Sequence, residues 1–159
     1  MGLLKNLVLC FVVSIICIVF LEISSRLLKL HGDTDPTYII NNNVMPFSMR
    51  PDSSSKSIYG KNFRINNFGL RGPDINLSKK AKTKRILVLG DSVTYGYCVN
   101  YEETFSGILH QKLTNSAEFE FEVINAGHNG FNIKDSTSYY NNYGKHFTPD
   151  VVIIAVTAS

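Results

Sequence analysis

The stretch that decides the fold is Arg85–Tyr97, which reads RILVLGDSVTYGY. Residues 86–89 form a continuous apolar run of the kind found in a strand that is covered on both faces. Gly90 breaks this strand, and Ser92 follows where a parallel strand would pass into a helix. Open α/β sheets place their chemistry in the crevice at the carboxyl ends of the strands. A serine there has an exposed hydroxyl and a free backbone N–H, so Ser92 is our candidate nucleophile.

Two further strands are predicted downstream, and both end in polar residues. Phe119–Ile124 runs into the segment NAGHNG at 125–130. Val151–Val156, again a strand of the buried type, runs into residues 157–159. The sequence therefore predicts three strands whose polar ends could share one site.

Two crossovers connect these strands. The first has apolar residues at helical spacing on one face, and the second runs from Ile133 to about Phe147. The apolar positions of the first are Phe105, Ile108, Leu109 and Leu113. Alternating strands and helices predict right-handed crossovers and a parallel sheet, so all three polar strand ends lie on one edge. We expect an α/β fold with one site at that edge.

Three short blocks, in this order, resemble those of the SGNH (GDSL-type) ester hydrolases. GDSVTYGY at 90–97 resembles the first block, NAGHNG at 125–130 the second, and PDVVIIAVTAS at 149–159 the lead-in to the third. The resemblance implies a flavodoxin-like three-layer parallel sheet with Ser92 as the nucleophile. It also implies an oxyanion hole formed by the backbone N–H groups of Ser92 and Gly130. The implied substrate is a lipid acyl ester or a carbohydrate O-acetyl ester, and no cofactor is implied.

The later blocks depart from the family pattern. Ungapped counting places Ser159 where the third block has its oxyanion asparagine. The fourth block, Asp-x-x-His, is absent, because no aspartate stands three residues before any of the four histidines. A serine hydroxyl is a poor nucleophile without a base. We therefore expect a truncated, nearly inactive N-terminal part of an esterase; the alternative is a non-catalytic, membrane-anchored binding module derived from the same fold.

Other polar residues near the predicted site have simpler roles. Asp91 is expected to be a turn residue that accepts backbone amides, and not a triad acid, while Asn129 supports the oxyanion loop. His128 is expected to line the cleft, with a substitute base for Ser92 as the alternative. His110 and His146 are expected at the surface. No spacing of His, Cys, Asp and Glu is typical of a metal site, so none is predicted.

The N-terminus predicts a membrane helix. Leu3–Leu21 is nearly all apolar and would span about 28 Å, close to the hydrocarbon thickness of a bilayer. No small-x-small cleavage site follows it, which favours an uncleaved single-pass anchor over a signal peptide. FLEISSRLL at 20–28 and FRINNFGLRGP at 63–73 resemble a membrane-anchored branch of the SGNH family, which implies an extracytoplasmic catalytic domain.

These features predict three parts of the chain. Residues 1–30 form the anchor and a juxtamembrane helix, 31–83 a polar linker, and 84–159 the N-terminal part of an SGNH-hydrolase-like domain. The linker has an alternating stretch, Tyr59–Leu70, that predicts a small hairpin bent at 66–69.

A basic run precedes the first strand. It consists of Lys79, Lys80, Lys82, Lys84 and Arg85. We expect it to be solvated, with contact to anionic lipid headgroups as the alternative. Nucleic acid is not expected as a partner, since the net charge is only +3 and no binding motif accompanies the run. Three strands bury little surface, so we also expect an open apolar edge on the last strand and marginal stability.

Overall fold

The computed structural model describes residues 2–28, 38–39, 48–56, 60–114 and 119–157. The chain divides into two compact units, Met1–Thr34 and Asp35–Ser159.

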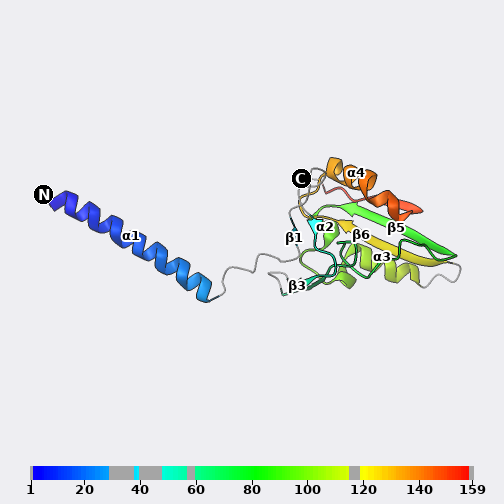
Figure 1. Ribbon diagram of the computed structural model, residues 1–159, viewed down its shortest axis with the longest axis horizontal. Helices are drawn as coiled ribbons and strands as arrows, with labels where there is room; N and C mark the ends of the chain where they lie inside the picture. The colour runs from blue at the N-terminus through cyan, green and yellow to red at the C-terminus, as the bar shows by residue number, and fades with distance from the viewer. Residues whose placement is uncertain (1, 29–37, 40–47, 57–59, 115–118, 158–159) are drawn as a thin grey trace. The chain divides into compact units, whose positions relative to one another are not determined.

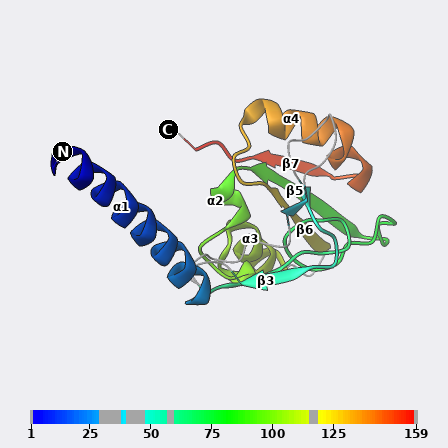
Figure 2. The same cartoon turned by 60° about the vertical axis from the view of Figure 1, so that its left-hand side comes forward.

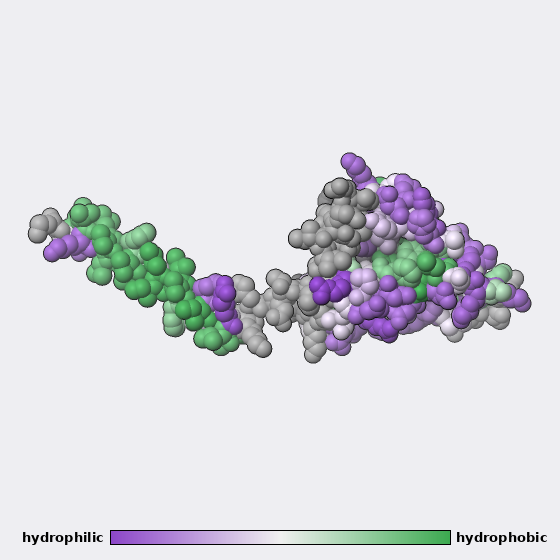
Figure 3. Space-filling view, in the orientation of Figure 1, coloured by the Kyte–Doolittle hydropathy of each residue, from purple (hydrophilic) through white to green (hydrophobic). Residues whose placement is uncertain are grey.

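In the first unit, the described residues form the helix α1 (Gly2–Leu27), which includes the predicted span at Leu3–Leu21. No residue of α1 is buried, and its surface is apolar along its length with polar residues near both ends (Figure 3). An exposed ion pair between Glu22 and Arg26 at 2.7 Å lies in its last turns. By length and composition, α1 is the one helix among the described residues that could cross a membrane.

The second unit is built on a parallel sheet of three strands in the order β6-β5-β7 (Figure 1). These strands are β5 (Thr83–Gly90), β6 (Glu120–Gly127) and β7 (Val151–Ile154). In the register, Leu89 of β5 lies opposite Ala126 of β6 and Ile154 of β7. The three strand ends are therefore level, and the predicted α/β fold with a parallel sheet is confirmed.

Helices cover both faces of this sheet (Figure 2). On one face, α3 (Phe105–Thr114) packs Leu109 and Leu113 against Ile86 and Val88. On the other face, α4 (Ile133–Asn142) and the 3-10 helix η2 (Gly144–Phe147) pack against the alternate residues of β5. Both crossovers thus lie where the sequence predicts them.

The face that α3 turns to the sheet differs from the prediction. Phe105 and Ile108 are 50% and 42% exposed, whereas Ser106 and Gly107 are buried. A Cβ at Gly107 would lie 2.2 Å from the carbonyl oxygen of Tyr101, so the helix approaches its neighbour at its smallest residues. This close approach turns the helix so that only Leu109 and Leu113 of the predicted apolar face reach the core.

Strand β7 is apolar but largely exposed. Val151, Val152 and Ile154 are 49%, 37% and 45% exposed. The prediction of a buried strand is therefore wrong for the described residues, because there β7 pairs with β5 alone. The predicted open apolar edge is present.

The segment before β5 forms two small antiparallel pairs. One joins β1 (Tyr38–Ile39) to β2 (Ser48–Met49), and the other joins β3 (Ser54–Lys56) to β4 (Asn62–Arg64). Of the predicted hairpin at 59–70, Tyr59 lies outside the described residues. An antiparallel bridge between Ile65 and Arg71 joins the two sides of its bend, while β4 pairs with the earlier β3.

The predicted bend at 66–69 is present. Asn66 is buried, and its Oδ1 accepts the backbone N–H groups of Phe68 and Leu70 at 2.9 and 3.0 Å. Beyond the bend, Arg71 forms a backbone bridge with Asn125, so this segment lies along the free edge of β6. The part of the linker next to the sheet is therefore packed.

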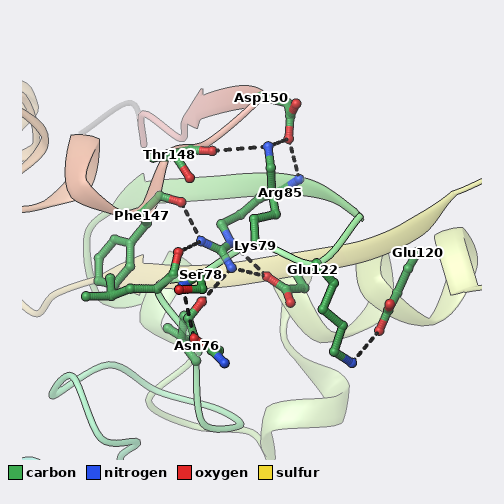
Figure 4. Close-up of polar contacts among 12 residues, drawn as sticks. Asn76, Ser78, Lys79, Arg85, Glu120, Glu122, Phe147, Thr148 and Asp150 are labelled. Atoms are coloured by element: carbon green, nitrogen blue, oxygen red, sulfur yellow. Dashed lines mark hydrogen bonds and ion pairs between the residues drawn. The ribbon is translucent and has the colours of Figure 1, made fainter. Parts of the chain in front are cut away.

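The basic run is solvated only in part: Lys80 and Lys82 are exposed as predicted, whereas Lys79 and Lys84 are half-buried and Arg85 is buried (Figure 4). Lys79 and Lys84 pair with Asp150 at 2.8 and 3.5 Å, and Lys80 pairs with Glu120 at 3.6 Å. The hydrogen bond from Lys79, followed by the one from the Arg85 backbone N–H, lowers the pKa of Asp150 from 3.8 to about 2.

Arg85 is fully buried at the start of β5. Its guanidinium lies 2.6 Å from a carboxylate oxygen of Glu122 and donates to the carbonyl oxygens of Phe147 and Asn76 at 2.6 and 2.7 Å (Figure 4). One side chain thus joins β5 and β6 to η2 and to the segment before the sheet.

Candidate functional site

Ser92 lies at the carboxyl end of β5, at the first position of the one-turn helix α2 (Ser92–Tyr95). Asp91 caps this helix by accepting the backbone N–H of Val93 at 2.9 Å. The side chain of Ser92 is exposed, and within the described chain no hydrogen-bond partner is found for its hydroxyl or its backbone N–H. Gly90 allows the tight turn before it, because a Cβ there would lie 2.2 Å from Thr94 Oγ1.

Asp91 links the ends of β5 and β7. Its second carboxylate oxygen accepts a hydrogen bond from the Thr157 hydroxyl. This bond, and then that from Val93, lowers the pKa of Asp91. The prediction of a turn residue that accepts backbone amides is confirmed, and the contact with Thr157 was not predicted.

Gly130 lies in the loop that follows β6. His128 donates its backbone N–H to the carbonyl of Gly90 at 3.0 Å, which joins this loop to the end of β5. The backbone N–H of Phe131 donates to the carbonyl oxygen of His128 at 3.2 Å, which closes a β-turn in which Gly130 has φ +76°. Such a turn requires positive φ at its third position, which favours glycine. Gly130 is exposed, and its N–H has no acceptor among the residues that the structure places.

The site therefore has two backbone donors that are not used inside the described protein. They are the N–H groups of Ser92 and Gly130, on adjacent strand ends that the register makes level. Asn129 is half-buried in the same turn as Gly130. Ser159, at the predicted asparagine position, lies outside the described residues.

His128 does not line the cleft as predicted. It is 2% exposed, its Nδ1 lies 3.1 Å from the carbonyl oxygen of Ala126, and its ring stacks on Phe131 at 4.5 Å. Burial lowers its pKa to about 4, so the ring is neutral at neutral pH. Of the other two histidines in the described part, His146 is exposed as predicted, whereas His110 is half-buried.

A cavity of about 430 Å³ begins beside the nucleophile position. Its polar lining comes from Asp91, Asn132, Lys134, Ser136 and Thr157. Its remaining lining comes from the start of α4 and the end of β7, and includes Phe131, Ile133, Ile154 and Val156. A largely apolar cavity next to a reactive centre is suited to hold the non-reacting part of a small substrate.

Sequence reasoning missed the residues that support α2. Arg71 and Asn125 are 2% and 1% exposed and donate to carbonyl oxygens of the turn that carries Ser92. Both belong to motifs that the sequence singled out, FRINNFGLRGP and NAGHNG, but nothing in either motif indicates its distant partner.

No group of three His, Cys, Asp or Glu side chains able to hold a metal ion occurs in the described ranges. No protein-family model matches this sequence, and no curated protein matches it significantly. Function must therefore be inferred from the residues and their geometry.

Proposed function

We propose that this chain carries the nucleophile and oxyanion hole of a membrane-anchored serine ester hydrolase of the SGNH type. The observation that carries the proposal is the exposed Ser92 hydroxyl, accompanied by the unused N–H groups of Ser92 and Gly130 at level strand ends. Acyl-ester and O-acetyl-ester hydrolysis both need this combination, because negative charge develops on the carbonyl oxygen.

The reaction begins with attack of Ser92 Oγ on the ester carbonyl carbon. The carbonyl π electrons move onto the oxygen, where the N–H groups of Ser92 and Gly130 stabilise the charge. Collapse of this intermediate breaks the ester C–O bond, releases the alcohol and leaves an acyl group on Ser92, which water then removes. One oxyanion donor contributes about 3 kcal/mol to such a transition state.

The proton of Ser92 requires a base, and the residues that the structure describes place no hydrogen-bond partner at its hydroxyl. His128 is buried with its Nδ1 on a backbone carbonyl, and no Asp-x-x-His segment is present. We therefore infer that the site becomes active only with a histidine and its aspartate from such a segment, and that the 159-residue chain alone does not turn over.

The remaining features fit the same proposal. The three-strand parallel sheet with helices on both faces supports the proposal of a flavodoxin-like, three-layer fold. Leu3–Leu21 in α1 anchors the protein in the bilayer, with the catalytic unit on the extracytoplasmic side. The cavity beside Asp91 holds the acyl part of the substrate.

A chimera tests the proposal. The C-terminal portion of an SGNH hydrolase, containing its asparagine and Asp-x-x-His blocks, is joined after Val156. We expect the chimera to react with a fluorophosphonate probe, and Ser92→Ala to abolish labelling while the exposed-serine control Ser78→Ala retains it. The 159-residue parent should show no hydrolysis above background. Labelling that survives Ser92→Ala would show that the nucleophile is wrongly assigned.

A non-catalytic binding module is the second candidate. It is favoured by the burial of His128, which leaves the described site without a base. A chimera that folds but never labels, together with a parent chain that binds esters without cleaving them, would support this candidate over the hydrolase.

A further inference from the structure

The turn that carries Ser92 is not stabilised by its own backbone hydrogen bonds alone. An α-helix leaves its last four carbonyl groups without partners inside the helix, and α2 has only four residues. Its first carbonyl, that of Ser92, accepts the N–H of Gly96 at 2.9 Å. The carbonyls that follow must find donors outside the helix or in water.

Two buried side chains supply these donors. Asn125 Nδ2 donates to the carbonyl of Thr94 at 2.9 Å. Arg71 Nη1 donates to the carbonyl of Tyr95 at 2.9 Å and also to that of Gly96, and its Nη2 donates to Val99 at 2.5 Å. Four carbonyl groups between Thr94 and Val99 are thus held by one arginine and one asparagine.

The two side chains are coupled to each other and to the sheet. Their residues form an antiparallel backbone bridge at the edge of β6. Asn125 Oδ1 also accepts the N–H of Gly127 at 3.0 Å, which fixes the orientation of the amide. The turn after β5 is therefore fastened to the end of β6 and to the 63–73 segment at once.

The charge of Arg71 is directed at these carbonyls. Within the described residues it forms no ion pair with a carboxylate, and its guanidinium lies 4.4 Å from the ring centre of Phe63 and 5.2 Å from that of Tyr95. Burial lowers its pKa, yet an arginine remains charged in proteins. A cation at the carboxyl end of a helix interacts favourably with its dipole. The planar fork also fits several oxygens at fixed angles, which a lysine cannot do.

Glycines make this arrangement possible. A Cβ at Gly127 would lie 2.4 Å from the backbone nitrogen of Tyr95, so α2 rests directly on the end of β6. Gly96 has φ +78°, and a Cβ there would lie 2.4 Å from Thr104 Cγ2. The glycines of the first and second blocks therefore allow the close contact that Arg71 and Asn125 then fix.

We propose that Arg71 and Asn125 are positioning residues that hold the Ser92 turn in its reactive geometry. Their catalytic meaning rests on the proposed function, but the clamp that they form can be tested without any ester. The test uses the full chain in detergent and measures amide exchange in Arg71→Lys, which keeps the charge and removes the fork. Arg64→Lys is the matched control, since Arg64 lies in the same segment and forms an exposed pair with Asp74 at 2.8 Å.

We expect Arg71→Lys to accelerate exchange of the Tyr95 and Gly96 amides at least tenfold while the β5 amides change less than twofold. Asn125→Ser, which removes the other donor, should do the same, and it provides a second variant if Arg71→Lys does not fold. Equal acceleration in α2 and β5 would show a merely structural role, and unchanged exchange in α2 would overturn the clamp.

A second readout follows the nucleophile position itself. Ser92→Cys, with the three native cysteines replaced by alanine, introduces a thiol at the start of α2. Thiols at helix N-termini have a lowered pKa. Arg71→Lys in this background should move the pH profile of alkylation to higher pH, whereas Arg64→Lys should not; an unchanged profile would overturn the positioning role. Both tests could support the clamp while Ser92 of the chimera never reacts with the fluorophosphonate probe. That result would refute the hydrolase proposal and leave the clamp supported.

Discussion

At the scale of single residues, two buried arginines fasten distant segments by binding backbone carbonyls. Arg85 joins η2 and the 76–77 segment to β6, and Arg71 joins the 63–73 segment to α2. Arg85 also has a carboxylate partner in Glu122, whereas Arg71 relies on carbonyl oxygens and aromatic rings among the described residues. Removing one partner of such a buried contact lowers the stability of the fold more than removing an exposed ion pair does. The reason is that the remaining charge or carbonyl group is buried and has no water to bond to.

Asp150 gives a prediction on pH. Its pKa is about 2 in the folded protein against an ordinary 3.8, first because of its hydrogen bond with Lys79. A carboxylate whose pKa is lowered by folding stabilises the fold above the unfolded pKa, and this contribution is lost as pH falls from about 4 toward 2. Asp150→Asn should therefore lower stability at pH 6 and flatten the loss between pH 4 and 2.

The measurement is the free energy of urea unfolding, followed by tyrosine fluorescence at several pH values. Asp74→Asn is the control, because Asp74 forms an exposed pair with Arg64 and should leave the acid dependence as it is. An acid dependence unchanged by Asp150→Asn would contradict the role given to the Lys79 contact.

The sequence could not reveal these arginine contacts. A run of basic residues usually indicates a solvated surface, and nothing near Arg85 in the sequence marks Glu122 or the carbonyl of Phe147 as partners. The contacts of Arg71 are even harder to predict, since its partners are backbone carbonyl oxygens, which no residue type marks in the sequence. By contrast, the position of Ser92 after β5 could be predicted from the local pattern of a strand followed by glycine, whereas Gly130 was singled out only by the resemblance of NAGHNG to a family block.

At the scale of elements, the strands were easier to predict than the faces of the helices. The apolar runs that become β5, β6 and β7 are set by local pattern, but the limits of the strands differ from the prediction. β5 covers Thr83–Gly90, β6 continues to Gly127, and β7 ends at Ile154. The inward face of α3 depends on the packing of Gly107 against Tyr101, so spacing alone placed Leu109 and Leu113 correctly but not Phe105 and Ile108. Likewise, the apolar pattern of β7 does not reveal that, among the described residues, β7 pairs with β5 alone and stays largely exposed.

The exposed strand β7 gives the next prediction. Val151 is 49% exposed on an edge strand, and a charge on such an edge prevents pairing with another chain. Val151→Lys should slow concentration-dependent aggregation in detergent, measured by light scattering, while the unfolding free energy changes by about 0.5 kcal/mol or less.

Ile153→Lys is the matched control, two residues further along the same strand. Ile153 is half-buried against Ile86, Val88 and Val123, so a lysine there should cost about 2 kcal/mol or more. Aggregation that is equally fast in wild type and Val151→Lys would show that the edge of β7 is not where the chains associate.

At the scale of the whole molecule, the chain combines an apolar helix with a unit that has its own core. α1 has no buried residue. An apolar surface of this kind is not stable in water, so α1 requires a bilayer or another apolar partner. The proposed ester hydrolysis would therefore take place within reach of a membrane surface.

The last prediction tests α1 as an uncleaved membrane span. The protein should remain in the membrane pellet after carbonate extraction, with its N-terminus intact. Val13→Asp combined with Ile16→Asp should release it, because each charge near the bilayer centre costs about 3 kcal/mol on insertion scales. Glu22→Gln, which changes charge only near the end of α1, is the control and should stay in the pellet. Release of the wild-type protein by carbonate, or a mature N-terminus that begins after Ser25, would show that α1 is not a permanent anchor, and the hydrolase proposal would then lose its membrane location while keeping its site.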